Sequence, residues 1–86
     1  MKLWDASVGK IVKVVAFYDE QLTERLKTYG IIEQAILKIE KKNGAGIIVS
    51  SRGRLLAMDR TYACIVGVEY ENRNNGQPKF RQNNLV

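Results

Sequence analysis

The strongest restriction on the fold of this chain comes from the dipeptide Asn43-Gly44, which stands between two short runs of strand-forming residues. In residues 36–42 apolar and charged side chains alternate, which is typical of a half-buried strand. Residues 46–50 form a returning apolar run. Asn-Gly favours a type I′ turn, because both central residues of that turn need positive φ. The sequence therefore predicts an antiparallel hairpin.

The other predicted elements are also short. Residues 20–29 place apolar side chains at helical spacing, between a capping Asp19 and a C-terminal Gly30. Asp59 can cap a single helical turn that follows it. Further strands are expected at residues 10–16, 55–58 and 64–70. The predicted fold is mainly β: a small barrel of about five strands, with one short α-helix after the first strand and a helical turn before the last.

The length of 86 residues allows one domain, and the hydrophobic fraction of 45% is normal for a globular protein. From residue 71 onward the composition changes to Asn, Gln, Arg and Gly, which cannot bury a core. We therefore expect one domain over residues 1–70 and a disordered polar tail over residues 71–86.

The net charge of +5 favours acidic partners, although a solubilising surplus of charge is the simpler interpretation. The single cysteine, Cys64, cannot form an intrachain disulfide, which fits a reducing compartment. The N-terminal residues contain no signal-like apolar run, and no segment approaches the roughly 18 apolar residues of a membrane span. A cytoplasmic location without membrane insertion is predicted.

The chain lacks the side chains from which catalytic and metal sites are usually built. It has no histidine, and Cys64 lies in a predicted apolar strand, where an inert core thiol is expected. Its carboxylates are scattered; the one adjacent pair, Asp19-Glu20, is explained by the start of a helix. The sequence predicts no catalytic residue, no cofactor and no metal site, so we expect a binding module rather than an enzyme.

Four basic residues would gather at the ends of neighbouring strands if the hairpin forms: Lys41, Lys42, Arg52 and Arg54. They are the candidate partner-contact patch, facing an anionic surface. The alternative is a solvated strand edge, where lysine is common because it discourages edge-to-edge aggregation. The tyrosines are not interleaved with these residues, so the stacking platform of single-strand nucleic-acid binders is not evident.

The order of these segments resembles the ferrous-iron transport protein A (FeoA) family over residues 3–70. The similar segments are Leu3 with the glycine turn and strand of 9–14, the helix end and cap of 25–31, the strand of 36–39, the turn and strand of 52–58, and Ala63 with Val66 and Val68. Two positions depart from the family pattern. Glu33-Gln34 stands where the family usually has Pro-Gly, and Asp59 stands where a basic residue is usual.

The resemblance implies an SH3-like barrel without enzymatic activity. FeoA domains occur as short cytoplasmic proteins that accompany the ferrous-iron permease (FeoB type), so the implied role is an accessory of ferrous-iron transport that binds the cytoplasmic part of the permease. They also occur fused to metal-dependent transcription regulators. A nucleic-acid-binding or regulator-associated small barrel is therefore the alternative, and a metal carrier or enzyme subunit ranks last. The sequence leaves the oligomeric state open.

Overall fold

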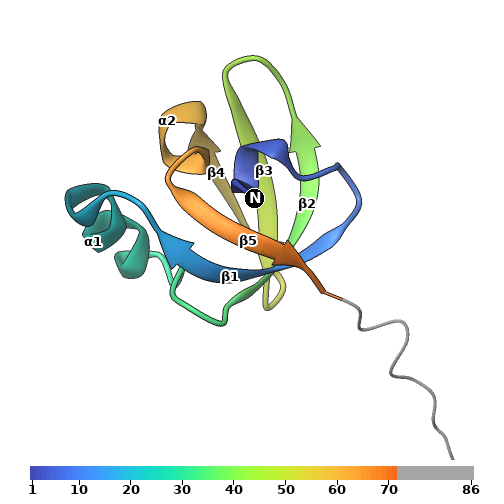
Figure 1. Ribbon diagram of the computed structural model, residues 1–86. Helices are drawn as coiled ribbons and strands as arrows, with labels where there is room; N and C mark the ends of the chain where they lie inside the picture. The colour runs from blue at the N-terminus through green and yellow to red at the C-terminus, as the bar shows by residue number, and fades with distance from the viewer. Residues whose placement is uncertain (72–86) are drawn as a thin grey trace, which may run out of the picture.

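A computed structural model describes residues 1–71 of the protein and shows one antiparallel sheet with three short helical segments (Figure 1). The strand order in the sheet is β4-β3-β2-β1-β5. The strands are β1 Ile11–Phe17, β2 Ile36–Lys42, β3 Gly46–Ser51, β4 Arg54–Asp59 and β5 Val66–Tyr70. The helical segments are the 3-10 helix η1 Leu3–Asp5, and the α-helices α1 Glu20–Thr28 and α2 Arg60–Ala63. The predicted mainly β fold, with its helix and helical turn, is confirmed.

The sheet curls strongly but does not close. Its register shifts between Val14 and Ala16 in β1 and between Ile39 and Lys41 in β2. Such bulges place an extra residue on one strand and increase the local twist. Within residues 1–71 no ladder joins the edge strands β4 and β5, so the predicted barrel is an open, barrel-like sheet.

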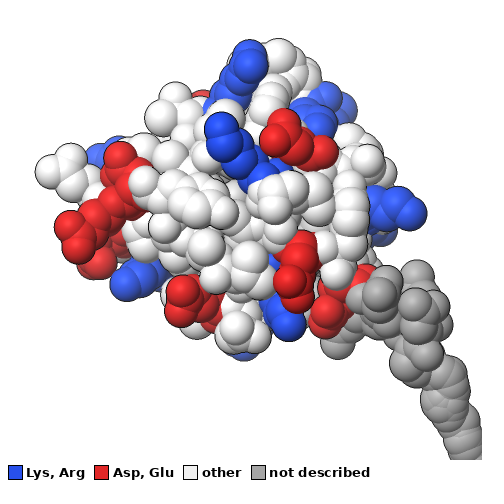
Figure 2. All heavy atoms as spheres, viewed as in Figure 1, with Lys and Arg blue, Asp and Glu red and all other residues white. Residues whose placement is uncertain are grey.

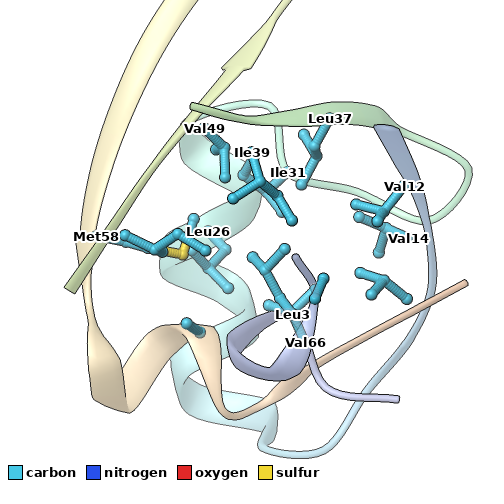
Figure 3. Close-up of a cluster of buried hydrophobic side chains, with 14 residues drawn as sticks. Leu3, Val12, Val14, Leu26, Ile31, Leu37, Ile39, Val49, Met58 and Val66 are labelled. Carbon is cyan, nitrogen blue, oxygen red and sulfur yellow. The ribbon is translucent and has the colours of Figure 1, made fainter. Parts of the chain in front are cut away.

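The core lies inside this curl. Strand residues Val12, Val14 and Leu37 are fully buried, and Leu3 of η1 and Leu26 of α1 point into the same cluster (Figure 3). Each fully buried aliphatic side chain of this size contributes roughly 1.5–3 kcal/mol relative to an exposed one. One small core therefore holds the sheet, α1 and the N-terminal segment together.

The N-terminal segment covers the free edge of β5. Lys2 forms a β-bridge with Gly67, and the N–H of Val68 donates to the carbonyl of Met1 at 2.8 Å. The following η1 was not predicted, because three residues are too few to show a helical period.

The predicted hairpin between β2 and β3 is confirmed, but the predicted turn type is wrong. Neither Asn43 nor Gly44 has positive φ; instead the Asn43 side-chain oxygen accepts hydrogen bonds from the N–H groups of Ala45 and Gly46, at 2.8 and 3.1 Å. A side chain that mimics the turn carbonyl removes the need for left-handed backbone. The conformation expected there occurs between β3 and β4, where Arg52 and Gly53 have φ of 55° and 78°.

The predicted helix ends are confirmed. Asp19 accepts from the N–H of Leu22 at 2.9 Å, and Gly30 after α1 has φ of 88°. The last strand begins at Val66 rather than at Cys64, because the helical turn continues: the N–H of Cys64 donates to the carbonyl of Arg60. The Cys64 thiol is consequently half-buried beside α2 and not a buried strand residue.

The predictions of no membrane span and of a disordered tail can be compared with the structure only over residues 1–71. No helix within residues 1–71 has both the length and the apolar character needed to cross a membrane. The disordered tail predicted for residues 71–86 lies, except for Glu71, outside the described residues. The N–H of Glu71 donates to the carbonyl of Ile11 at 2.9 Å.

Candidate partner-binding surface

The structure separates the four residues of the predicted basic patch. Lys42 lies opposite Ile47 at one end of β3, whereas Arg54 lies opposite Ser51 at the other end. Four residues of strand separate these ends by roughly 13 Å. The patch therefore divides into two lysines near the β2–β3 loop and two arginines at the β3–β4 turn. Contact of either pair with a partner stays a prediction.

The charged ammonium group of Lys42 makes its hydrogen bonds within the protein. Its ammonium group donates to the backbone carbonyls of Trp4 and Ala6, at 2.8 and 2.9 Å, and lies 5.5 Å from the centre of the Trp4 ring. Arg60 of α2 lies 5.0 Å from the same ring. These hydrogen bonds from Lys42 hold the N-terminal turn against the sheet. The adjacent Lys41 is exposed.

A groove of about 520 Å³ runs between α1 and β4. Arg25, Leu26 and Tyr29 line it from the helix, residues 56–59 from the strand, and Tyr62 from α2. Arg25 donates from Nη1 to the hydroxyl of Tyr62 at 3.0 Å, and this hydrogen bond raises the pKa of Arg25. The guanidinium thereby links α1 to α2 beside the groove.

A second hollow, of about 770 Å³, shares Tyr29 and Leu56 with the first. It extends past Ile32 and Glu33, in the loop after α1, to the β3–β4 turn with its two arginines. We call the two hollows together the α1–β4 groove.

Large apolar side chains stand exposed along this groove. Tyr29, Ile32 and Leu55 keep 64%, 48% and 70% of their surface accessible. Of the described residues 1–71, the charged ones that line the groove are four cations, Arg25, Lys38, Arg52 and Arg54, and two carboxylates, Glu33 and Asp59. Apolar side chains gathered under a charged rim are typical of a protein-interaction site.

Sequence reasoning found Arg52 and Arg54 but missed the apolar part of this surface. The available signal was the run Leu55-Leu56-Ala57-Met58, in which apolar residues occupy both faces of one strand. A strand at the edge of a sheet with such a run must expose one apolar row, as Leu55 does.

Other parts of the surface are less distinctive. Figure 2 shows basic and acidic side chains interspersed over one face of the molecule, without a continuous basic stripe. Among residues 1–71 no three His, Cys, Asp or Glu side chains come together as metal ligands would.

The evolutionary relationship of the chain follows from a match to a protein family. The family model for the FeoA domain matches residues 1–70. This chain belongs to the FeoA family. The resemblance noted over residues 3–70 is thereby confirmed. No curated protein matches the chain significantly by sequence.

Solved structures agree with the FeoA assignment. The FeoA protein from Chlorobium tepidum is 29% identical, with a TM-score of 0.73 over 95% of this chain and 85% of its own. An FeoA-like protein from Clostridium acetobutylicum is 21% identical, with a TM-score of 0.76 over 92% and 95%. A manganese-dependent transcriptional repressor shares the fold at 17% identity, with a TM-score of 0.71 over 77% of this chain and 39% of its own.

The two departures from the FeoA pattern lie at a turn and at a helix cap. Gln34 has φ of 77° in a turn where the N–H of Ala35 donates to the carbonyl of Ile32 at 3.0 Å. This is the third position of a type II turn, which Pro-Gly suits best. Asp59 caps α2 by accepting from the N–H of Thr61 at 3.1 Å, which a basic side chain could not do.

Proposed function

We propose that this protein is a small cytoplasmic accessory protein of ferrous-iron transport, which acts as a protein–protein interaction module on the cytoplasmic part of an FeoB-type permease. Membership of the FeoA family supports the role in iron transport. Two similar solved structures point the same way, one an iron uptake regulatory protein and the other iron(II) transport protein A of Clostridium thermocellum.

The observation that carries this proposal is the α1–β4 groove. Tyrosine and arginine are the residue types that most often dominate binding energy at protein interfaces, and Arg25, Tyr29 and Tyr62 all line the groove. The exposed Leu55 adds an apolar anchor. The surface thus offers the residue types that contact with another protein requires.

A direct binding measurement tests the proposal. The full chain is titrated, at physiological salt, into the purified cytoplasmic domain of its cognate permease by isothermal titration calorimetry. We expect saturable binding that Leu55→Ser weakens about tenfold or more, because interface anchors typically contribute more than about 1.4 kcal/mol.

Val8→Ser is the matched control. Val8 is also exposed, at 52%, but does not line the groove, so its substitution should leave the affinity unchanged. Absence of binding by the correctly folded wild-type chain would contradict the proposal.

A nucleic-acid-binding role is the second candidate. The net charge of +5 and the fold shared with a manganese-dependent transcriptional repressor favour it. A gel shift at increasing salt discriminates, because release of counterions makes such binding fall steeply with salt. No shift even at low salt would remove this candidate.

A further inference from the structure

The outer edge of β4 carries unpaired backbone groups. A two-residue turn makes its flanking residues, Ser51 and Arg54, a hydrogen-bonded pair. In the regular ladder that follows, Leu56 and Met58 direct their N–H and C=O groups toward β3, whereas Leu55 and Ala57 direct theirs away. Within residues 1–71 no other element hydrogen-bonds the backbone of Leu55 or Ala57.

The two edge strands of the sheet, β5 and β4, differ in whether another segment pairs with their outer side. The edge of β5 is covered by the N-terminal segment, through the bridge between Lys2 and Gly67. No part of the chain within residues 1–71 covers the edge of β4 in this way, and the ladder of β4 with β3 contains no bulge. Its central residues 55–58 include neither charge nor proline, the usual protections of a free edge. This edge is therefore open to another strand.

A helix forms the opposite wall. α1 contributes Arg25, Leu26 and Tyr29 to the groove that runs along residues 56–59 of β4 (Figure 1 shows both elements). An extended peptide hydrogen-bonded to β4 would lie about 4.8 Å from it, with alternate side chains facing the groove and the solvent. A slot between an edge strand and a helix suits recognition by strand addition.

Charge specifies the chemistry of the occupant. Within the part of the chain that the structure describes, four cations and two carboxylates line the α1–β4 groove, and both arginines of the β3–β4 turn lie at its Leu55 end. A second copy of the chain would bring the same cationic surplus and a net charge of +5, so it is the less complementary partner.

We propose that β4 accepts an extended segment of the partner protein as an additional strand in the α1–β4 groove, and that this segment alternates apolar with acidic residues. The inference rests on the proposed function, in that it names the kind of segment that the interaction module binds. Backbone hydrogen bonds to Leu55 and Ala57 supply affinity. The apolar and cationic side chains that line the groove supply selectivity.

The test starts from a random library of displayed ten-residue peptides, selected against the full chain at physiological salt. We expect the enriched peptides to alternate apolar residues with Asp or Glu. One enriched peptide is then synthesised, and amide hydrogen exchange of the protein is followed by NMR. Exchange at Leu55 and Ala57 should slow at least tenfold on binding, while exchange at Leu56 and Met58, already paired with β3, should change little.

Ala57→Pro removes an edge amide that does not belong to the β3 ladder, so the fold should tolerate it. This variant should bind the peptide at least tenfold more weakly, whereas Ala57→Ser, which keeps the amide, should bind normally. Circular dichroism confirms that both variants fold.

Any of the following results would overturn the inference: no enriched peptide, equal binding by Ala57→Pro, unprotected amides at Leu55 and Ala57, or a dimer through β4 that excludes peptide. Preference for oligonucleotides over peptides would also overturn it. The two proposals fail separately. Peptide binding without binding of the permease domain removes the proposed function alone, and permease binding that Ala57→Pro leaves intact removes strand addition alone.

Discussion

Gln34 and Arg52 are the residues other than glycine that have positive φ within residues 1–71. For side chains with a Cβ this conformation costs on the order of 1 kcal/mol or more. Arg52 shares its turn with Gly53, whereas Gln34 stands without glycine in the turn between Ile32 and Ala35. Gln34 is also exposed, so its side chain gains little from burial in return.

We predict that Gln34→Gly raises the free energy of unfolding by about 1 kcal/mol, because glycine adopts the required backbone without steric strain. Urea denaturation followed by circular dichroism measures the change. Glu33→Gly, in the same turn but without positive φ, should lower stability instead. An unchanged or reduced free energy of unfolding for Gln34→Gly would show that the positive φ of Gln34 does not strain the backbone.

The phenol of Tyr70 offers a pH-dependent reporter. Hydrogen bonds with Ser7, first through its hydroxyl and then through its backbone N–H, lower the pKa of Tyr70 below its ordinary 10.0. Because the folded-state pKa is lowered, the resulting stability is present above the unfolded pKa near 10 and is lost as pH falls through the folded pKa. It is therefore confined to alkaline pH and does not act at neutral pH.

We predict that Ser7→Ala raises the Tyr70 pKa toward 10.0, since one of the two hydrogen bonds to the phenolate is lost. NMR titration of carbon-13-labelled tyrosine follows the ionisation. Ser51→Ala should leave it unchanged, and an identical Tyr70 titration in Ser7→Ala would contradict the assigned cause.

Among the elements, those with a repeated pattern or a marked end could be predicted from the sequence. β2 has the predicted bounds because its side chains alternate, and α1 begins after the predicted cap Asp19. Features that depend on one hydrogen bond could not be predicted. The hydrogen bonds to the Asn43 side chain gave the β2–β3 turn a type other than the predicted one. The hydrogen bonds from Lys42 hold η1, whose three residues show no helical period in the sequence.

We predict that Lys42→Met lowers the free energy of unfolding by about 2 kcal/mol, because each charge-assisted hydrogen bond contributes roughly 1.5–3 kcal/mol and water compensates part of the loss. Thermal and urea unfolding provide the measurement. Lys41→Met is the matched control on the adjacent exposed lysine, with an expected change within about 0.5 kcal/mol. Equal effects of the two substitutions would contradict the fastening role of Lys42.

For the molecule as a whole, the fold class followed from the order of short strands and turns, but the α1–β4 groove did not. Its walls include residues 25–29 and 54–59, which are distant in sequence and are brought together only by the tertiary fold. Periodicity along the chain carries no information about which edge stays open. The arginines at the β3–β4 turn were recognised as basic residues, but not as part of an apolar surface.

We predict that Fe²⁺ or Mn²⁺ binds only in the millimolar range. The described residues bring no three metal-ligand side chains together, and residues 72–86 contain no His, Cys, Asp or Glu. Anaerobic isothermal titration calorimetry measures the affinity. Micromolar binding by the full chain would show that it holds the ion itself.

The indole of Trp4 lies close to two cations, 5.5 Å from the Lys42 ammonium group and 5.0 Å from the Arg60 guanidinium, and Trp4 is the sole tryptophan of the chain. Its fluorescence is therefore a label-free optical reporter of one event, the release of the N-terminal turn from the sheet. Release would remove both neighbouring cations from the ring and shift the emission maximum. An unchanged emission spectrum then shows that a substitution elsewhere has left the surroundings of this ring intact.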